Sequence, residues 1–222
     1  MHLAVAATEK EMDAFSRLAR DWRLRPQQLV SGVGPMEAGI ILSRYLEKHH
    51  TKISAVVNFG IGGAYFSGPE KQLDLLDICL AEREVLGDFG ICYGDRVEPF
   101  EQDAFPVQWL FKLDSGLLHQ ARSALAAEAI KAVAGTFVTV NGASALKVRG
   151  DYFADRYGAI CENMEGAAVA RVCELFDLPL VEVRAISNQV EDRSEEPWPI
   201  AEAAARAAQA AMLIIKRLED KR

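Results

Sequence analysis

The sequence predicts an α/β protein in which helices cover both faces of a sheet. Residues 1–63 repeat a unit of apolar strand, turn and helix, the order typical of such sheets. Residues 160–190 then combine a helical pattern, a proline stop and another apolar strand. The chain has 222 residues and shows no internal repeat, linker or break in composition. We therefore expect one domain, residues 1–222, with a substantial core.

The first strand and helix are expected between residues 3 and 20. Residues 3–7 form a short apolar run, and a helix follows from Thr8 to about residue 20. Thr8 and Glu11 have the Thr-x-x-Glu spacing of a capping box, in which each side chain bonds the other residue's backbone N–H. This cap alone is a sufficient structural role for Glu11.

Two further strands are expected to end in glycine-containing turns. Residues 29–31 form a strand that runs into the segment 32–39 and a helix ending near residue 50. Residues 53–58 form the next strand, which ends in the glycine-rich residues 59–63. Backbone N–H groups of such loops can line a cleft for a small ligand.

The segment 32–39 also invites comparison with the dinucleotide-binding fingerprint. It lacks the third glycine at the required spacing, and Pro35 lies inside the loop. No acidic residue near Asn58, at the end of the next strand, fits the ribose-binding role. The sequence therefore argues against a NAD enzyme and implies no cofactor.

The middle of the chain is less regular. We expect a strand over residues 75–84, a turn-rich excursion over 87–106 and an alanine-rich helix over 117–134. A strand over residues 135–140 and a short connecting element over 150–157 follow.

The segment 160–190 predicts a helix followed by a buried strand. Apolar residues recur at helical spacing until Pro179, which lacks an N–H and forces the preceding residue out of the α region. Residues 180–186 are short, apolar and β-branched, as in a buried strand. A last helix, over residues 200–218, begins after Pro199 and is rich in alanine.

Two polar positions in this segment need an explanation. Met164-Glu165 opens the helix, and Ser187-Asn188 leaves the carboxyl end of the strand, the rim where open α/β sheets usually place their sites. A first-turn carboxylate favoured by the helix dipole would account for Glu165. A turn residue that tolerates unusual backbone angles would account for Asn188. Neither residue alone identifies a function.

Composition excludes several classes of protein. The net charge of −7 and the isoelectric point near 5.2 argue against nucleic acid as a partner. No apolar run is long enough to span a membrane, and the N-terminus lacks the basic region of a signal peptide, so we expect a cytoplasmic protein. The four cysteines and four histidines are dispersed without ligand spacing, so no metal site is expected.

The motifs around these two positions carry a family resemblance. Glu-Asn-Met-Glu-Gly-Ala-Ala-Val-Ala-Arg-Val-Cys over residues 162–173 and Val-Glu-Val-Arg-Ala-Ile-Ser-Asn over residues 181–188 resemble the purine nucleoside phosphorylase/nucleosidase superfamily. Within it, Arg-Ala-Ile-Ser-Asn and a tryptophan soon after, Trp198, resemble the futalosine hydrolases. The resemblance runs along nearly the whole chain. It implies a three-layer αβα sandwich with a central mixed sheet, usually as a homodimer.

The resemblance also implies hydrolysis of an N-glycosidic bond. Glu11 matches the glutamate that activates water, Arg184 its partner that orients water and carboxylates, and Glu165 the residue that binds the ribose hydroxyls. A carboxylate at the nucleophile site repels phosphate but can accept a proton from water, so hydrolysis is favoured over phosphorolysis. Glu9 and Glu11 both disfavour a phosphorylase.

Asn188 stands where the adenine-specific nucleosidases carry an aspartic acid. Its amide can donate to O6 and accept from a protonated N7 of a 6-oxopurine. The resemblance therefore implies a small-molecule nucleoside substrate, futalosine first. It places these residues around the substrate: Gly60, Ile61, Gly62, Val140, Asn141, Met164, Ser187 and Trp198. Phe100, Phe105 and Trp198 are candidates for the pocket of the 5′ substituent.

Three alternatives stay open. Methylthioadenosine/S-adenosylhomocysteine nucleosidase activity is the second choice, which Asn188 and Ile61 both disfavour. An inosine/guanosine phosphorylase is the third. A nucleoside-binding protein without catalysis is the fourth, in which Glu11 would be only a helix cap.

Overall fold

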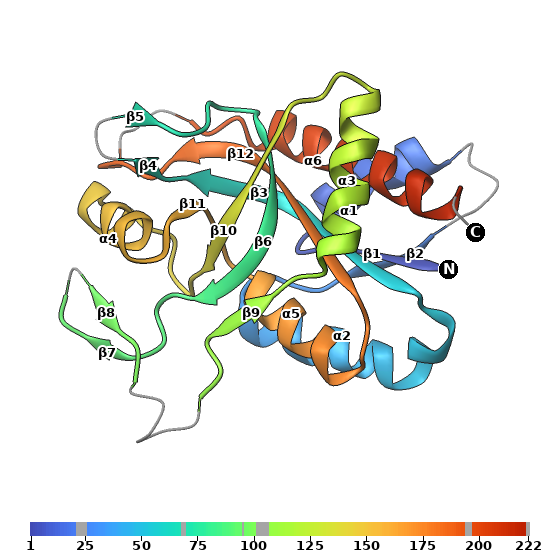
Figure 1. The fold of residues 1–222 in the computed structure, drawn as a ribbon, viewed down its shortest axis with the longest axis horizontal. Coiled ribbons are helices and arrows are strands. Elements are labelled where there is room, and N and C mark those ends of the chain that lie inside the picture. The colour runs from blue at the N-terminus through green and yellow to red at the C-terminus, as the bar shows by residue number, and fades with distance from the viewer. Residues whose placement is uncertain (21–25, 68–69, 95, 101–106, 194–196, 221–222) are drawn as a thin grey trace.

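A central sheet with helices on both faces dominates the computed structural model, which describes residues 1–20, 26–67, 70–94, 96–100, 107–193 and 197–220 (Figure 1). Within these residues the sheet has eight strands. They are β1 (His2–Ala6), β2 (Gln27–Val30), β3 (Ala55–Ala64), β6 (Ile78–Leu86), β9 (Leu110–Lys112), β10 (Ala132–Thr139), β11 (Ala159–Asn163) and β12 (Leu180–Gln189). Two small antiparallel pairs flank it: β4 (Phe66–Ser67) with β5 (Glu70–Lys71), and β7 (Ile91–Cys92) with β8 (Val97–Glu98).

The sheet is mixed, with strand order β11-β10-β6-β12-β3-β1-β2. Strands β2, β1, β3 and β12 run parallel to one another, and so do β6, β10 and β11. The two sets meet where β12 pairs antiparallel with β6, and β9 adds an antiparallel edge to β6. Strand β11 also pairs antiparallel with β3, so β11, β10, β6, β12 and β3 close into a ring.

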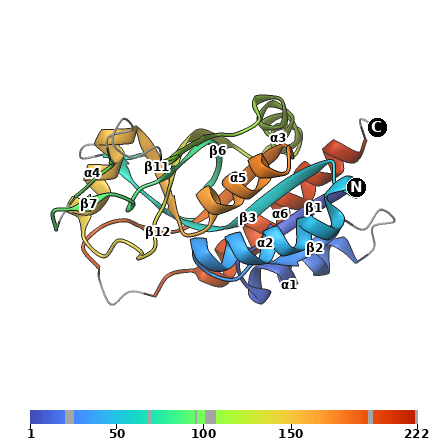
Figure 2. The same ribbon diagram turned by 90° about the horizontal axis from the view of Figure 1, so that it is seen from below.

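Helices form a layer on each face of the sheet (Figures 1 and 2). Helices α1, α3 and α6 share one core with the sheet, and α2 and α5 share another. The predicted three-layer αβα sandwich with a central mixed sheet is therefore confirmed. The helices are α1 (Glu9–Ala19), α2 (Pro35–His49), the 3₁₀ turn η1 (His50–Lys52), α3 (Ser115–Ala127), α4 (Lys147–Tyr157), α5 (Gly166–Leu175) and α6 (Ile200–Glu219).

The sequence dictates how closely the α6 layer approaches the sheet. Helix α6 buries alanines at positions 203, 204, 207, 208, 210 and 211, and such short side chains let the helix axis lie near its neighbours. Phe15 of α1 fills the space beside it and packs at a tilt against Phe59 of β3, with ring centroids 5.2 Å apart. Met12 and Ala19 complete the buried face of α1, as its apolar spacing predicts.

Several expected boundaries were wrong, and the two largest differences concern residues 59–63 and the helix expected over residues 117–134. Residues 59–63 are not a turn after a strand, because β3 continues to Ala64 through its pairing with β12 and β11. The helix expected over residues 117–134 ends at Ala127, where Ala129 adopts a left-handed φ of 55°, and β10 begins at Ala132. High helix propensity in the alanine-rich sequence concealed this break.

Other elements were missed or misplaced. Strand β9 and strand β11 were not predicted, and α4 begins at Lys147 rather than at residue 150. Ser187 and Asn188 lie inside β12, which bulges between Ile186 and Asn188, so Asn188 is not a turn residue. In the described part of the chain, no helix has the length and apolar character needed to cross a membrane.

Candidate active site

A cavity of about 710 Å³ opens where the parallel strands β1, β3 and β12 end. Its walls come from the first turns of α1, the ends of β3, β11 and β12, and the start of α6. This volume lies in the range of small-molecule sites, and the position is the one expected for an α/β sheet. Nine of the twelve predicted site residues line it: Glu11, Ile61, Gly62, Met164, Glu165, Arg184, Ser187, Asn188 and Trp198.

Glu11 caps α1 and faces the cavity at the same time. Its Oε2 accepts hydrogen bonds from the Thr8 backbone N–H at 3.0 Å and from the Thr8 hydroxyl at 2.7 Å, while its own N–H donates to Thr8 at 3.3 Å. Its Oε1 accepts from the Ile61 N–H at 3.0 Å. The carboxylate is 5% exposed. The capping box is confirmed, and it holds one carboxylate oxygen while the other faces β3.

Arg184 is a fully buried cation among carboxylates. Its Nη1 donates to Glu165 Oε2 and to the Ile61 carbonyl, each at 3.3 Å, and its Nε donates to Glu182 Oε1 at 2.9 Å. Burial lowers the pKa of the guanidinium, but the charges of Glu182, Glu165 and Glu11 outweigh it and raise that pKa further above its ordinary value. Arg184 is therefore a permanent positive charge.

Glu165 stands at the N-cap position of α5 but does not cap that helix. Its Oε1 accepts from the Gly34 N–H at 3.1 Å, and its Oε2 contacts Arg184. Burial raises the pKa of this carboxyl above its ordinary value, although Arg184 and the Gly34 N–H act in the opposite direction. The helix-dipole interpretation of Glu165 thus gives way to a side chain turned toward the cavity.

Gly60 makes this arrangement possible. A β-carbon at position 60 would lie 2.6 Å from Glu11 Oε1 and 2.8 Å from Arg184 Nη1. The carboxylate and the guanidinium therefore lie on the same face of β3, over the space that a side chain at position 60 would fill. Gly62 is crowded in the same way, by the sulfur of Cys161.

Asn188 lies at another part of the cavity and has a fixed amide. Its Oδ1 lies 2.9 Å from the Ser187 hydroxyl, and its Nδ2 donates to the Gln189 carbonyl at 3.3 Å. The Ser187 hydroxyl also lies 3.3 Å from the Gly62 carbonyl and can donate to only one of the two acceptors at a time. Asn188 is 8% exposed, so part of its amide faces the cavity.

Other predicted residues lie elsewhere. Val140 is buried in a core cluster, and the Asn141 side chain bonds Asp88 at 2.9 Å; neither lines the cavity. Phe100 packs edge-on against Phe89, with centroids 5.7 Å apart, and also lies outside it. Phe105 falls outside the described residues. Of the two aromatic candidates within the described residues, Trp198 lines the cavity, with the Arg193 guanidinium 4.9 Å above its ring.

Sequence reasoning missed Glu162. It lines the cavity beside Met164, and its carboxylate accepts from the Ser144 N–H at 2.8 Å, the Ser144 hydroxyl at 2.5 Å and the Tyr65 hydroxyl at 3.0 Å. Burial, and then the charge of Glu162, raise the pKa of Tyr65 well above its ordinary value, so Tyr65 remains a donor. Glu162 opens the motif that carries the family resemblance, but because β11 itself was not predicted, nothing indicated that its side chain lies here.

Glu182 was also missed, although a signal existed. It precedes Arg184 by two residues in an otherwise apolar strand, and side chains two apart in a strand share a face. No comparable signal distinguished Glu84 from Glu82, because both stand in the charged run 82–84 of one strand.

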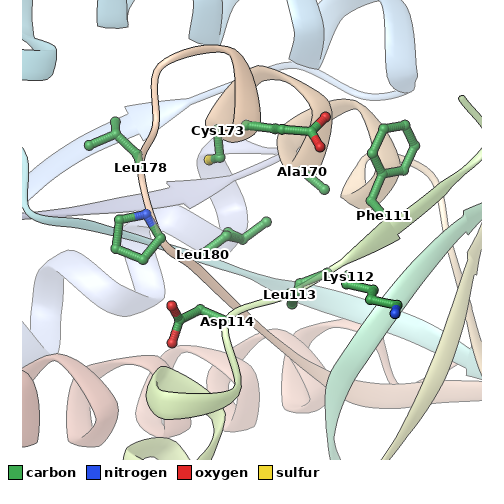
Figure 3. A pocket seen from close by; sticks show the side chains of 10 residues that line it. Phe111, Lys112, Leu113, Asp114, Ala170, Cys173, Leu178 and Leu180 are labelled. Atoms are coloured by element: carbon green, nitrogen blue, oxygen red, sulfur yellow. The ribbon is translucent and has the colours of Figure 1, made fainter.

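A second hollow, of about 230 Å³, lies between β9, the start of α3 and the end of α5 (Figure 3). Its charged side chains mostly have structural partners. Asp114 caps α3 by accepting from the Leu117 N–H at 2.7 Å, and Glu174 accepts from Gln108 at 2.9 Å. It is smaller than a typical ligand pocket, so the chemistry is assigned to the larger cavity. The described residues contain no cluster of metal-ligating side chains.

Comparison with known proteins identifies the family of the chain. The sequence profile of the phosphorylase superfamily matches residues 26–220. The chain belongs to the phosphorylase superfamily. It is 31% identical to a futalosine hydrolase of Thermus thermophilus over 82% of this chain and 77% of that protein. It is 30% identical to a futalosine hydrolase of Streptomyces coelicolor over 92% of this chain and 91% of that protein. These relatives show that this member of the superfamily is an N-glycosyl hydrolase.

Solved structures show the same fold at lower identity. The futalosine hydrolase of Helicobacter pylori superposes with a TM-score of 0.78 at 17% identity, over 99% of this chain and 97% of that chain. The 5′-methylthioadenosine/S-adenosyl homocysteine nucleosidase of Helicobacter pylori, in complex with a small-molecule ligand, gives 0.80 at 17% identity, over the same fractions.

The close approach at Gly60 generates a prediction. Gly60→Ala should lower kcat/KM for hydrolysis of the N-glycosidic bond by about 10²-fold, because the methyl group displaces Glu11 and Arg184 by a fraction of an ångström or more. Steady-state kinetics and urea unfolding of the same preparations check this. Gly39→Ala is the control, since a β-carbon there meets no atom within 4 Å. Unchanged kinetics in Gly60→Ala would show that the reaction does not depend on this approach.

Proposed function

We propose that the protein hydrolyses the N-glycosidic bond of a 6-oxopurine nucleoside, with futalosine as the substrate and hypoxanthine and dehypoxanthine futalosine as products. The observation that carries the base preference is that the residue lining this part of the cavity is an amide, Asn188. The similarity to two futalosine hydrolases supports the choice of nucleoside. The reaction would then serve menaquinone biosynthesis by the futalosine route.

Glu11 is proposed to activate the attacking water. One of its oxygens is held by Thr8, and the other accepts from a single backbone N–H, which leaves it capacity to accept a proton from water. The carboxylate is buried beside Arg184, whose charge would orient both the carboxylate and the water.

Glu165 is proposed to bind the ribose hydroxyls and to stabilise the sugar as it becomes cationic. Cleavage of the bond develops oxocarbenium character on the ribose and negative charge on the leaving base. The raised pKa of Glu165 means that the carboxylate loses its charge at a higher pH than an ordinary glutamate. Met164, the neighbouring residue in the cavity wall, would provide an apolar floor under the ribose.

Asn188 is proposed to recognise the base. With Oδ1 oriented by Ser187 and one N–H directed to Gln189, the second N–H can donate to O6, and Oδ1 can accept from a protonated N7. A 6-aminopurine presents a donor at position 6, which would face the amide N–H unfavourably. Trp198 at the rim would contact the 5′ substituent.

The homodimer and the cytoplasmic location implied by the resemblance stay predictions. Three apolar side chains near the start of α2 support self-association: Val33, Met36 and Ile40 are 54%, 74% and 50% exposed. Val33 also lines the cavity, so a partner on this surface would lie close to the substrate.

The function is tested by measuring base release from futalosine, inosine and methylthioadenosine, each with and without phosphate. We expect hypoxanthine from futalosine at a rate that does not depend on phosphate. Adenine released from methylthioadenosine instead would assign the protein to the adenine-specific nucleosidases. Dependence on phosphate would assign it to the phosphorylases.

Glu11→Gln should reduce kcat by about 10²- to 10⁴-fold and leave substrate affinity within a few-fold, since the amide keeps the size of the side chain but cannot take a proton. Single-turnover kinetics and calorimetric titration of the substrate measure the two effects. Glu9→Gln is the matched control, because Glu9 is an exposed carboxylate in the same helical turn. Equal loss in both variants would remove Glu11 from the mechanism.

Asn188→Asp should move the base preference toward adenine. The carboxylate would repel O6 and, when protonated, donate to N7, so the kcat/KM ratio of inosine to methylthioadenosine should fall by about 10²-fold or more. Competition between the two nucleosides in one reaction measures this ratio directly. A ratio unchanged by the substitution would show that Asn188 does not read position 6.

A further inference from the structure

Two glutamates that the proposed reaction does not use lie completely buried beneath the site. Glu84 on β6 and Glu182 on β12 are each 0% exposed. Their strands are antiparallel neighbours, and Glu182 shares a strand face with Arg184. Ionised carboxylates are almost never fully buried unless they are paired, so both side chains need partners.

The two carboxylates turn toward the same point, at the first residue of α5. A β-carbon on Gly166 would overlap Glu84 Oε1 and would lie 2.6 Å from Glu182 Oε2. Glycine at this position therefore leaves room for two carboxylate oxygens to approach each other.

Of the four oxygens of the two carboxyl groups, one lacks a hydrogen-bond donor. Glu84 accepts from the Asn163 amide at 2.6 Å and from the Thr139 hydroxyl at 2.8 Å. Glu182 Oε1 accepts from Arg184 Nε at 2.9 Å, but Glu182 Oε2 is buried without a donor. A proton on the Glu84 carboxyl would provide that donor.

We propose that Glu84 and Glu182 hold one proton between them, and that the pair positions both Arg184 and the turn that carries Glu165. Two facing carboxylates in a dry site do not both ionise. Burial and the charge of Glu182 raise the pKa of Glu84 well above its ordinary value. The Glu182 carboxylate meanwhile accepts a hydrogen bond from Nε of Arg184 at 2.9 Å.

Each member of the pair acts on a different part of the site. Glu182 occupies Nε of Arg184, which directs Nη1 to Glu165 and Ile61. Glu84 holds the Asn163 amide, whose Oδ1 accepts from the N–H groups of Glu165 and Gly166 at 3.0 Å and 2.7 Å. The catalytic consequence depends on the proposed roles of Arg184 and Glu165, whereas the shared proton does not.

The titratable groups that surround Glu84 and Glu182 do not take over the role of the shared proton. Arg184 contacts Glu182, and the charges of Glu165 and Glu11 act on Arg184 in turn. The charge of Glu182 also acts on Glu165 and on the thiols of Cys161 in β11 and Cys173 in α5. Burial raises the pKa of both thiols, so they stay neutral. Among the described residues, Arg184 is the cation whose charge offsets that of the Glu84–Glu182 pair.

Infrared spectroscopy tests the proton directly. At neutral pH the wild type should show the C=O stretch of a protonated carboxylic acid, shifted in D₂O, which disappears in Glu84→Gln. Glu82→Gln is the control, because Glu82 is an exposed carboxylate on the same strand. A wild-type spectrum without this band, or a band that persists in Glu84→Gln, would overturn the shared proton.

Stability against pH provides a second readout. The folded pair keeps a proton that the unfolded chain releases above the ordinary glutamate pKa of 4.5. Unfolding therefore releases a proton, and stability falls as pH rises from about 4.5 through the raised pKa. The unfolding constant of the wild type relative to Glu84→Gln should rise by up to about tenfold per pH unit in this window. A ratio independent of pH would contradict the proposal.

Kinetics tests the positioning role. Glu182→Gln should lower kcat at least about tenfold more than Glu84→Gln does, because only the former removes the anion that balances Arg184. Loss of that anion should also move the acidic limb of the kcat/KM profile to lower pH, since Glu182 helps to raise the pKa of Glu165. A purely structural role would lower stability and leave the limb in place, and that outcome would overturn positioning. If Glu182→Gln does not fold, Glu84→Gln carries the test. Because Glu84 holds the Asn163 amide that orients the turn of Glu165, the acidic limb of Glu84→Gln should be displaced from that of Glu82→Gln, and coinciding limbs would overturn positioning.

Discussion

The architecture of the cavity depends on one buried cation. Arg184 lies in the middle of β12, and its guanidinium joins side chains from α1, the start of α5 and β12 itself. A buried ion pair repays the loss of hydration only when its hydrogen bonds are nearly complete. Arg184, Glu11, Glu165 and Glu182 therefore form one unit. Removing any one of the three carboxylates would disturb the other groups.

Small residues let this unit assemble inside a sheet. Gly60 and Gly166 stand where side chains would collide with the charged groups, and neither adopts an unusual backbone angle. Their role is to leave room for the charged side chains. The same holds for the alanines of α6, so much of the sequence that looks featureless in composition determines how closely charged strands and helices can approach.

The sequence predicted the layers, most strands and nine residues of the cavity lining. It could do so because apolar periodicity, the capping box and the Met-Glu and Arg-Ala-Ile-Ser-Asn segments are local signals. It failed where structure depends on distant partners. The pairing of β11 with β3 places Glu162 beside the cavity, the pairing of β12 extends β3 past its glycines, and Val140 turns into the core.

The ring of strands has a mechanical consequence. Because β11 pairs with both β10 and β3, the strands that carry Gly60, Glu162 and Arg184 form a closed hydrogen-bonded belt. Spreading any two of them would break backbone hydrogen bonds, so this part of the wall is stiff. The entry and exit of a ligand must therefore be accommodated by the helical wall of α1 and α6 and by the rim around Trp198, which hold no such belt.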